Sequence, residues 1–241
     1  MKKKIIIAAV AVMAVVASLC VSFVFYYNGL LNQAHGYVEP KENQIKVACV
    51  GDSVTYGMTM KNWRKNAYPF QLREMLGDGY CVENFGFSGR TVSQKGDRPY
   101  IKEKLYKKSI EFQPDIVILQ IGSNDSKPFN WKGRDEFISY YKELLDSYIN
   151  LSSEPKIYIC TPPPAFPYKK DKVKFFIKPD TISDEITPAV REIADEYNIE
   201  LIDLFEMFDS KPELFNDGLH PNDEGAKLMT EKVNELILTI R

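Results

Sequence analysis

Histidine and cysteine are scarce in this sequence, with two and four copies among 241 residues. Cys20 lies in an apolar N-terminal segment, whereas Cys49, Cys81 and Cys160 lie in apolar runs typical of buried strands. Three cysteines cannot all pair with one another, and so small a number excludes a scaffold built from disulfides. We therefore expect buried free thiols and a domain that is stabilised by its hydrophobic core.

A surplus of positive charge is also missing, since 31 Lys and Arg stand against 33 Asp and Glu for a formal net charge of −2. This balance argues against a nucleic-acid partner. Few histidines and scattered carboxylates lack the spacing of metal ligands, and no metal or other cofactor is expected. The sequence shows no internal repeat, and its 44% of hydrophobic residues predicts one globular domain with an appendage.

The appendage is an N-terminal segment, residues 5–27, that contains no charged side chain. A helix of this length reaches about 35 Å, enough to cross a hydrocarbon core of ~30 Å. Lysines at positions 2–4 predict a cytoplasmic N-terminus and a domain that faces outward. We expect a membrane anchor over residues 1–28, a tether over 29–44 and a domain over 45–241. The alternative is a cleaved signal peptide and a secreted protein.

Five apolar runs alternate with segments of helical period across the domain. The runs predict strands at residues 45–50, 80–85, 115–121, 156–161 and 199–203. Apolar residues spaced three and four apart predict amphipathic helices at 137–148, 186–197 and 226–237. The alternation predicts a doubly wound, flavodoxin-like three-layer α/β sandwich with a five-stranded parallel sheet. If the strand order is 2-1-3-4-5, the first three strands end side by side.

Small polar residues follow each of these three strands, at the end where open α/β sheets bind their ligands. Ser53, which follows Gly51 and Asp52, is a candidate nucleophile, and an ordinary turn is the alternative. Gly86 and Asn124 follow the next two strands. A backbone N–H at a glycine and an asparagine amide are suitable donors to a developing oxyanion, although both residues are also common in turns.

His220 is the single histidine of the predicted domain, because His35 belongs to the tether. Imidazole is the side chain best suited to be a general base at neutral pH. Asp217, three residues earlier, can orient this ring as the third member of a catalytic triad does. The alternative is that Asp217 and His220 cap the last helix, although Asn222 or Asp223 can already do so.

Together these residues resemble the four sequence blocks of the SGNH hydrolases, also called GDSL esterases and lipases. The blocks are Gly51-Asp52-Ser53, Gly86 within Asn-x-Gly-x-Ser-Gly, Gly122-x-Asn124-Asp125 and Asp217-x-x-His220-Pro221, and the resemblance covers residues 45–237. It implies Ser53 as nucleophile, His220 as base, Asp217 as orienting acid, and an oxyanion hole made by Ser53, Gly86 and Asn124. Val54 replaces the motif's leucine, and the loop after Asn124 resembles that of carbohydrate-deacetylating branches.

We therefore predict an extracytoplasmic serine esterase that removes short acyl groups, above all acetyl, from a carbohydrate through an acyl-enzyme on Ser53. Arg90, Tyr100, Lys127 and Trp131 lie in loops near the predicted site, and such side chains suit sugars or simply local packing. The alternatives are a lipid acylhydrolase of the lysophospholipase kind, an O-acetyltransferase of a cell-wall glycan, and a flavodoxin-like binding module without catalysis. The binding module would leave Asp217 and His220 without a role.

Overall fold

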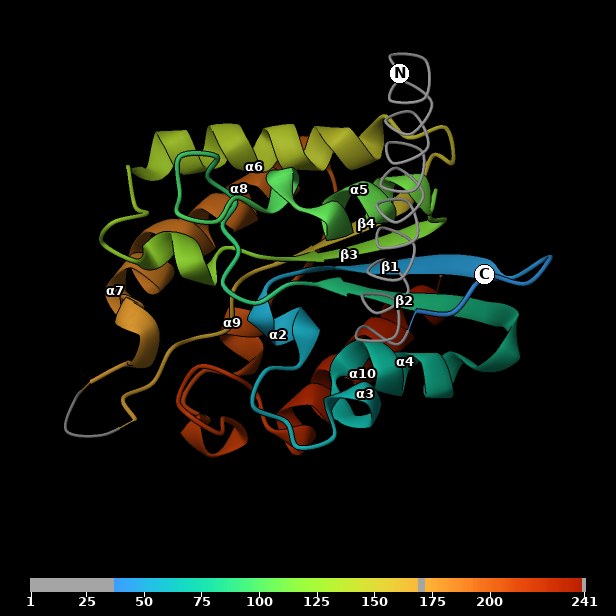
Figure 1. Ribbon diagram of the computed structural model, residues 1–241. Coiled ribbons are helices and arrows are strands. Elements are labelled where there is room, and N and C mark those ends of the chain that lie inside the picture. The colour runs from blue at the N-terminus through green and yellow to red at the C-terminus, as the bar shows by residue number, and fades with distance from the viewer. Residues whose placement is uncertain (1–36, 169–171, 240–241) are drawn as a thin grey trace, which may run out of the picture. The chain divides into compact units, whose positions relative to one another are not determined.

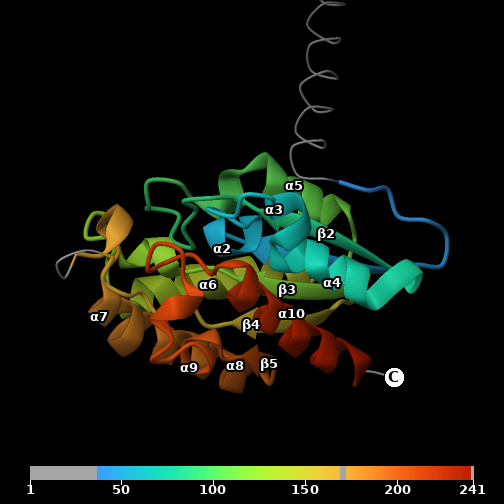
Figure 2. The same ribbon diagram turned by 90° about the horizontal axis from the view of Figure 1, so that it is seen from below.

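A five-stranded parallel sheet organises the computed structural model, which describes residues 37–168 and 172–239. The strands are β1 (Ile45–Gly51), β2 (Tyr80–Gly86), β3 (Ile116–Gln120), β4 (Lys156–Cys160) and β5 (Glu200–Ile202). Their order is β2-β1-β3-β4-β5, and Figure 2 shows them side by side from β2 to β5. The predicted parallel sheet and its order are confirmed, and each predicted strand differs from the observed one by only a residue or so at either end.

Helices cover both faces of this sheet and give the predicted three layers. The helices are α2 (Ser53–Tyr56), α3 (Trp63–Asn66), α4 (Tyr68–Leu76), α5 (Lys104–Glu111), α6 (Arg134–Ile149), α7 (Pro179–Thr181), α8 (Thr187–Tyr197), α9 (Leu204–Met207) and α10 (Asp223–Leu238). Figure 1 shows α5, α6 and α8 on one face and α4 and α10 on the other. The amphipathic segments predicted at 137–148, 186–197 and 226–237 correspond to α6, α8 and α10.

The core fills the space between each helical layer and the sheet. On the α6 side, Phe137, Tyr141, Leu144, Leu145 and Tyr148 are all at most 2% exposed, as their helical spacing predicts. The three described cysteines are buried in strands and carry free thiols, which confirms the expectation from their number. Burial of these apolar side chains is the main source of stability in a domain without cross-links.

The amino-terminal end of the described chain packs against β2 before the first strand begins. Val38 donates its backbone N–H to Glu83 Oε1 at 2.9 Å, and Gln44 donates its side-chain amide to Asp78 and Tyr80 carbonyl oxygens. Residues 38–44, part of the predicted tether, therefore contact the domain. The predicted anchor over residues 1–28 lies outside the described residues, and within those residues no helix is long and apolar enough to cross a membrane.

The register of the first three strands brings their carboxyl ends to one level. Gly51, the last residue of β1, pairs with Gly86 of β2 on one side and with Gln120 of β3 on the other. A Cβ on Gly51 would lie 2.1 Å from the Gln120 carbonyl oxygen, so a larger residue would push β1 and β3 apart. In Figure 1 the loops after these strands meet at the left end of the sheet, where α2 follows β1.

Candidate active site

Ser53 is presented by a tight strand-to-helix turn. Asp52 caps the short helix α2 by accepting the Val54 N–H at 3.0 Å, and Gly57 ends this helix in the left-handed conformation, with φ of 87°. The turn leaves the Ser53 backbone N–H without a hydrogen-bond partner among the described residues. The Ser53 side chain, 6% exposed, therefore stands at the carboxyl end of β1 next to an unused backbone donor.

His220 reaches Ser53 from the loop before α10. Its Nε2 lies 3.0 Å from Ser53 Oγ, and its Nδ1 lies 3.0 Å from Asp217 Oδ2 and 3.1 Å from Asp217 Oδ1. Gly218 makes the turn between the acid and the histidine with φ of 80°, where a Cβ would lie 2.2 Å from the Phe166 carbonyl oxygen. The structure thus brings Ser53, His220 and Asp217 into the order of a catalytic triad.

Asp217 is held as a carboxylate in this arrangement. Burial alone would raise its pKa, but hydrogen bonds from the His220 side chain and from the Leu219 and His220 backbone N–H groups outweigh burial and lower the pKa to about 2. Asn222 caps α10 by accepting the N–H groups of Glu224 and Gly225. The alternative that Asp217 and His220 serve as caps of α10 is therefore wrong, because Asn222 fills that position.

Asn124 lies beside Ser53 on the turn that follows β3. Its side chain is 5% exposed and places Nδ2 3.5 Å from Asp52 Oδ2, so this amide is only weakly engaged and can donate to a substrate oxygen. The Asn124 carbonyl accepts a hydrogen bond from the Asn130 side chain at 3.0 Å, which ties the turn to the following loop. The predicted pair of Ser53 N–H and Asn124 Nδ2 is brought together.

Gly86, the other predicted oxyanion donor, lies away from this position. Its N–H donates to Asn84 Oδ1 at 2.9 Å, and a Cβ on it would lie 2.4 Å from the Tyr56 backbone nitrogen. Gly86 therefore serves the packing of α2 on β2. Gly89, three residues later, lines the cavity at Ser53, has φ of 83°, and its N–H has no hydrogen-bond partner among the described residues. The geometry favours Gly89 as the second backbone donor.

The triad opens into a small cavity of about 270 Å³. Ser53, Gly89, Asn124 and His220 line its floor, and Met58, Ser88, Asp97, Arg98, Lys127, Phe175 and Leu219 line its walls. Phe175 packs edge-on against the His220 ring, with 5.7 Å between centroids. The cavity is slightly smaller than the ~300–1,000 Å³ typical of small-molecule sites.

The sequence of the chain matches the model of the GDSL-like lipase/acylhydrolase family over residues 49–228. The chain belongs to this family. The matched range contains the whole triad and the loops that surround it, so the resemblance derived from the four sequence blocks is confirmed.

Individual relatives agree with this assignment. The chain is 37% identical over 228 residues to an acetylxylan esterase of Xylanibacter ruminicola, an alignment that covers 86% of this chain and 46% of the relative. The chain spans about half the length of the curated relatives that it matches first.

Solved structures show the same fold. A putative arylesterase from Agrobacterium tumefaciens matches with a TM-score of 0.69 at 20% identity, covering 81% of this chain and 99% of that one. A carbohydrate acetylesterase from Sinorhizobium meliloti matches with a TM-score of 0.66 at 19% identity, covering 82% and 100% of the two chains. At this level of identity, these matches bear on the fold alone.

Of the four residues predicted to bind substrate in this GDSL-like protein, only Lys127 lines the cavity. Tyr100 is fully buried and donates its hydroxyl to the Phe85 carbonyl at 2.7 Å, so this placement does not support contact with substrate. Arg90 stacks on Phe87 and donates to Glu103 Oε1. Trp131 packs against Phe137. These three side chains support the loops behind the cavity.

The cavity residues that were not predicted from the sequence are Met58, Ser88, Gly89, Asp97, Arg98, Phe175 and Leu219. Gly89 had a local signal, because Asn-x-Gly-x-Ser-Gly contains two glycines and the second lies beyond the strand. Phe175 lies far along the chain from every motif residue. Arg98 follows Gly89 in the connection between β2 and α5, but no sequence pattern indicates that either side chain reaches the cavity at Ser53.

Replacing Asn124 by alanine should lower kcat by roughly 10²- to 10³-fold, the usual loss when one oxyanion donor is removed. KM should change much less, because the bond strengthens as charge develops on the substrate oxygen. Steady-state hydrolysis of an acetyl ester measures both constants. Asn150→Ala, which removes an amide at the exposed end of α6, is the matched control. An unchanged kcat in Asn124→Ala would remove this residue from the mechanism.

Two buried carboxyl groups near Ser53 should make the protein less stable as pH rises. Burial raises the pKa of Asp52 to about 6 and that of Asp125 to about 7, from a usual value of 3.8. The folded state then holds protons that the unfolded chain has lost, and stability falls as pH rises through these two values, by on the order of 1 kcal/mol per pH unit.

Chemical denaturation at pH 5 and pH 8 measures this difference. The free energy of unfolding should be larger at pH 5, and Asp125→Asn should show a smaller difference between the two pH values than the unmodified protein does. The low pKa of Asp217 changes the free energy of unfolding only below about pH 4. It therefore does not affect the comparison between pH 5 and pH 8. Equal or greater stability at pH 8 would contradict the assignment of buried, protonated carboxyls.

Proposed function

We propose that this protein is a serine esterase that hydrolyses short acyl esters, above all acetyl esters, of carbohydrates. The observation that carries the proposal is the chain of contacts from Ser53 Oγ through His220 to Asp217, at 3.0 Å for each link. A serine bonded to a histidine that is oriented by a carboxylate is an activated nucleophile. Membership in a lipase and acylhydrolase family is consistent with this chemistry.

The reaction follows from the positions of these groups. Ser53 Oγ attacks the ester carbonyl while His220 Nε2 takes the hydroxyl proton, and the negative charge on the former carbonyl oxygen is stabilised by Ser53 N–H, Gly89 N–H and Asn124 Nδ2. His220 then returns the proton to the leaving alcohol, and the C–O bond to that alcohol breaks. A water molecule, deprotonated by His220 Nε2, attacks the acyl carbon. The bond from this carbon to Ser53 Oγ then breaks, His220 returns the proton to Oγ, and the carboxylic acid is released.

The preference for acetyl is supported by the size of the cavity and by one relative. The apolar wall is short, consisting of Met58, Phe175 and Leu219, and offers little surface to a long acyl chain. The relative with 37% identity is described as an acetylxylan esterase, which supports a carbohydrate as the alcohol.

Rates with acetyl, butyryl and octanoyl esters of one alcohol test the acyl preference. We expect kcat/KM to fall as the chain lengthens, because the additional methylene groups find no apolar surface in the cavity. A panel of acetylated glycans, with acetate release as readout, tests the carbohydrate part. A preference for octanoyl over acetyl would contradict the proposal and favour a lipid acylhydrolase.

We also propose that the domain works outside the cytoplasm, anchored by residues 5–27. Support comes from the sequence of this segment, which is uncharged and preceded by three lysines. Fractionation of cells that express the full chain should place it in the membrane fraction, and external protease should degrade the domain in spheroplasts. Recovery in the soluble cytoplasmic fraction would contradict the anchor.

A further inference from the structure

Two cations line the cavity at Ser53 without a carboxylate partner among the residues that the structure describes. Arg98 and Lys127 both belong to the cavity wall, and neither forms an ion pair within the described residues. Arg90, in the same part of the fold, is by contrast paired with Glu103 at 2.8 Å. The Lys127 side chain is unusual because the residue is only 9% exposed, and a buried charge is costly unless it is partnered.

The positions of both cations are fixed close to the reacting groups. Arg98 Nη1 lies 3.6 Å from the position that a Cβ on Gly89 would occupy, directly beside the proposed oxyanion donor. Lys127 is the first residue after the turn that carries Asn124, and its carbonyl accepts the N–H groups of Asn130 and Trp131. An ester held by Ser53 therefore has both cations within the same small cavity.

Asn130 connects the two loops that carry these side chains. It is 1% exposed, accepts the Asp97 N–H at 2.9 Å, and donates to Asp97 Oδ1 at 2.9 Å and to the Asn124 carbonyl at 3.0 Å. The loop of Arg98 is thereby fastened to the loop of Asn124. A binding position built on two tied loops is preorganised, which limits the entropy lost when a ligand is bound.

The acidic groups near these cations do not neutralise them by contact. Asp97 lines the cavity and accepts a hydrogen bond from Asn130 at Oδ1, and it forms no ion pair within 4.0 Å with either cation. Asp52 and Asp125 are buried close enough to act on the Lys127 charge electrostatically, but neither forms an ion pair with it. Burial lowers the pKa of Lys127, which agrees with an ammonium group that lies over the Phe129 ring, 6.0 Å from its centroid, and forms no ion pair with a described carboxylate. An anionic group on the substrate would provide an ion-pair partner.

We propose that Arg98 and Lys127 bind a carboxylate of the substrate next to the scissile ester, which makes acidic carbohydrate esters the preferred substrate class. The inference rests on the proposed esterase function and adds the charge of the substrate to it. A guanidinium and an ammonium group on one carboxylate form charge-assisted hydrogen bonds. The carboxylate can belong to the sugar, as in an acetylated uronic acid, or to the acyl group, as in a succinyl half-ester.

The test compares esters that differ only in charge. The first pair is an acetylated methyl uronoside and its uronamide, and the second is the hemisuccinyl ester of one neutral methyl glycoside and the same ester with its free carboxylate replaced by a carboxamide. Released acid is measured for each at about 20 mM and about 500 mM salt, since screening weakens exposed charge interactions. We expect kcat/KM for the charged member to exceed that of the neutral member by roughly tenfold to a hundredfold at low salt, and this ratio to fall at high salt.

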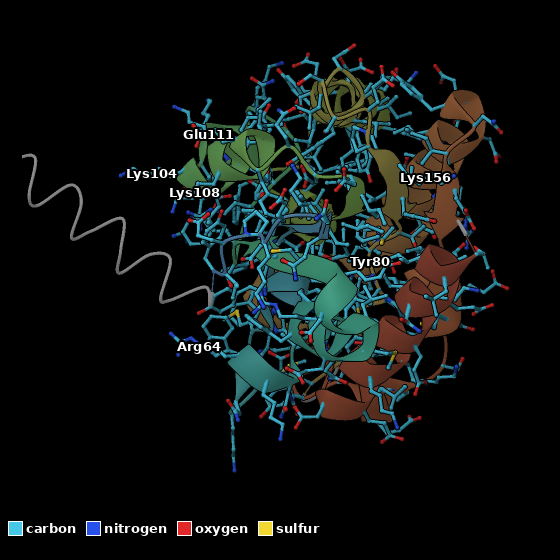
Figure 3. All side chains as sticks on the ribbon, turned by 90° about the vertical axis from the view of Figure 1, so that its right-hand side faces the viewer. Arg64, Tyr80, Lys104, Lys108, Glu111 and Lys156 are labelled. Carbon is cyan, nitrogen blue, oxygen red and sulfur yellow. The ribbon has the colours of Figure 1, made fainter. Side chains whose placement is uncertain are left out.

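Variants assign the preference to the two cations. Arg98→Gln and Lys127→Gln should each reduce the ratio of charged to neutral substrate, and the double variant should bring it close to one. Lys156→Gln is the matched control for charge, because Lys156 lies at the amino end of β4, on the face that Figure 3 shows and away from the cavity. The ratio of kcat/KM on the charged substrate to kcat/KM on the neutral substrate should be the same in Lys156→Gln as in the unmodified protein.

The outcomes separate the inference from the function on which it rests. A preference in the first pair places the carboxylate on the sugar, and a preference in the second pair places it on the acyl group. Equal rates within both pairs would overturn the inference and leave the esterase intact. An equal loss on charged and neutral esters in the two variants would also overturn it, since the cations would then serve the reaction itself. No acid release from any ester would overturn the proposed function.

Discussion

Replacing Ser53 by alanine should lower kcat for ester hydrolysis by roughly 10⁴- to 10⁶-fold, the range seen when a triad nucleophile is removed. The variant lacks the atom that forms the acyl-enzyme, and His220 then has only water to deprotonate. Residual activity should come from the oxyanion donors and from binding alone. Steady-state rates on an acetyl ester measure the effect.

The fold should survive this change, because Ser53 Oγ has His220 Nε2 as its described hydrogen-bond partner and the helix α2 is capped by Asp52. Far-ultraviolet circular dichroism and the midpoint of thermal unfolding provide the check. Ser88→Ala removes another hydroxyl from the same cavity wall and should retain most of the activity. A Ser53→Ala variant that hydrolyses the ester at an undiminished rate would mean that the reaction uses a different nucleophile.

Replacing Asp217 by asparagine should lower kcat by about 10⁴-fold while leaving the structure intact. Asp217 Oδ1 accepts the N–H groups of Leu219 and His220 at 3.1 and 2.9 Å, and an asparagine oxygen can keep both bonds. The amide nitrogen of the new side chain then faces His220 Nδ1. Because an amide N–H donates, Nδ1 must accept, and the ring proton moves to Nε2, which can no longer take the proton of Ser53.

The kinetic measurement is paired with a structural one. Thermal unfolding of Asp217→Asn should stay close to that of the unmodified protein, since both backbone hydrogen bonds are retained. Asp217→Ala loses these bonds as well and should be less stable, which distinguishes positioning of the histidine from support of the loop. Full activity in Asp217→Asn would show that the tautomer of His220 is not controlled by this carboxylate.

Much of the fold was predictable because strands and helices bury their residues with different periods. The apolar runs at 45–50 and 156–161 contain enough β-branched and apolar residues to predict buried strands, and the structure confirms them as β1 and β4. The stripe from Phe137 to Tyr148 repeats at three and four residues, and it forms the buried face of α6. Local pattern is sufficient where one face of an element must meet the core.

The sequence predicted the site correctly where two residues are close neighbours in the chain. It selected a less suitable residue where the outcome depends on how far a strand extends and how it pairs. Asp217 and His220 share one turn, and their proximity follows from three residues of separation. Gly86, however, still belongs to β2, where it pairs with Gly51, so its N–H is used inside the structure. A donor to substrate must lie beyond the end of the strand, which favours Gly89.

Arg98 and Phe175 of the cavity wall were not predictable because no local pattern shows that their loops fold onto the site. Arg98 lies in the connection between β2 and α5, and Phe175 lies in the connection between β4 and α8. Phe175 and Phe176 have φ of 59° and 62°, a left-handed backbone that bulky side chains rarely adopt. No sequence pattern indicates such a conformation, and only the folded chain shows that Phe175 is held over His220.

Labelling with a fluorophosphonate tests the central claim most directly, because this reagent reacts with an activated serine nucleophile. Intact-mass analysis after labelling should show a single adduct, and peptide mapping should assign it to Ser53. The adduct should be absent in Ser53→Ala and strongly reduced in His220→Ala, which keeps the serine and removes its base. An adduct on another residue, or none on the folded protein, would contradict a serine esterase built on Ser53, His220 and Asp217.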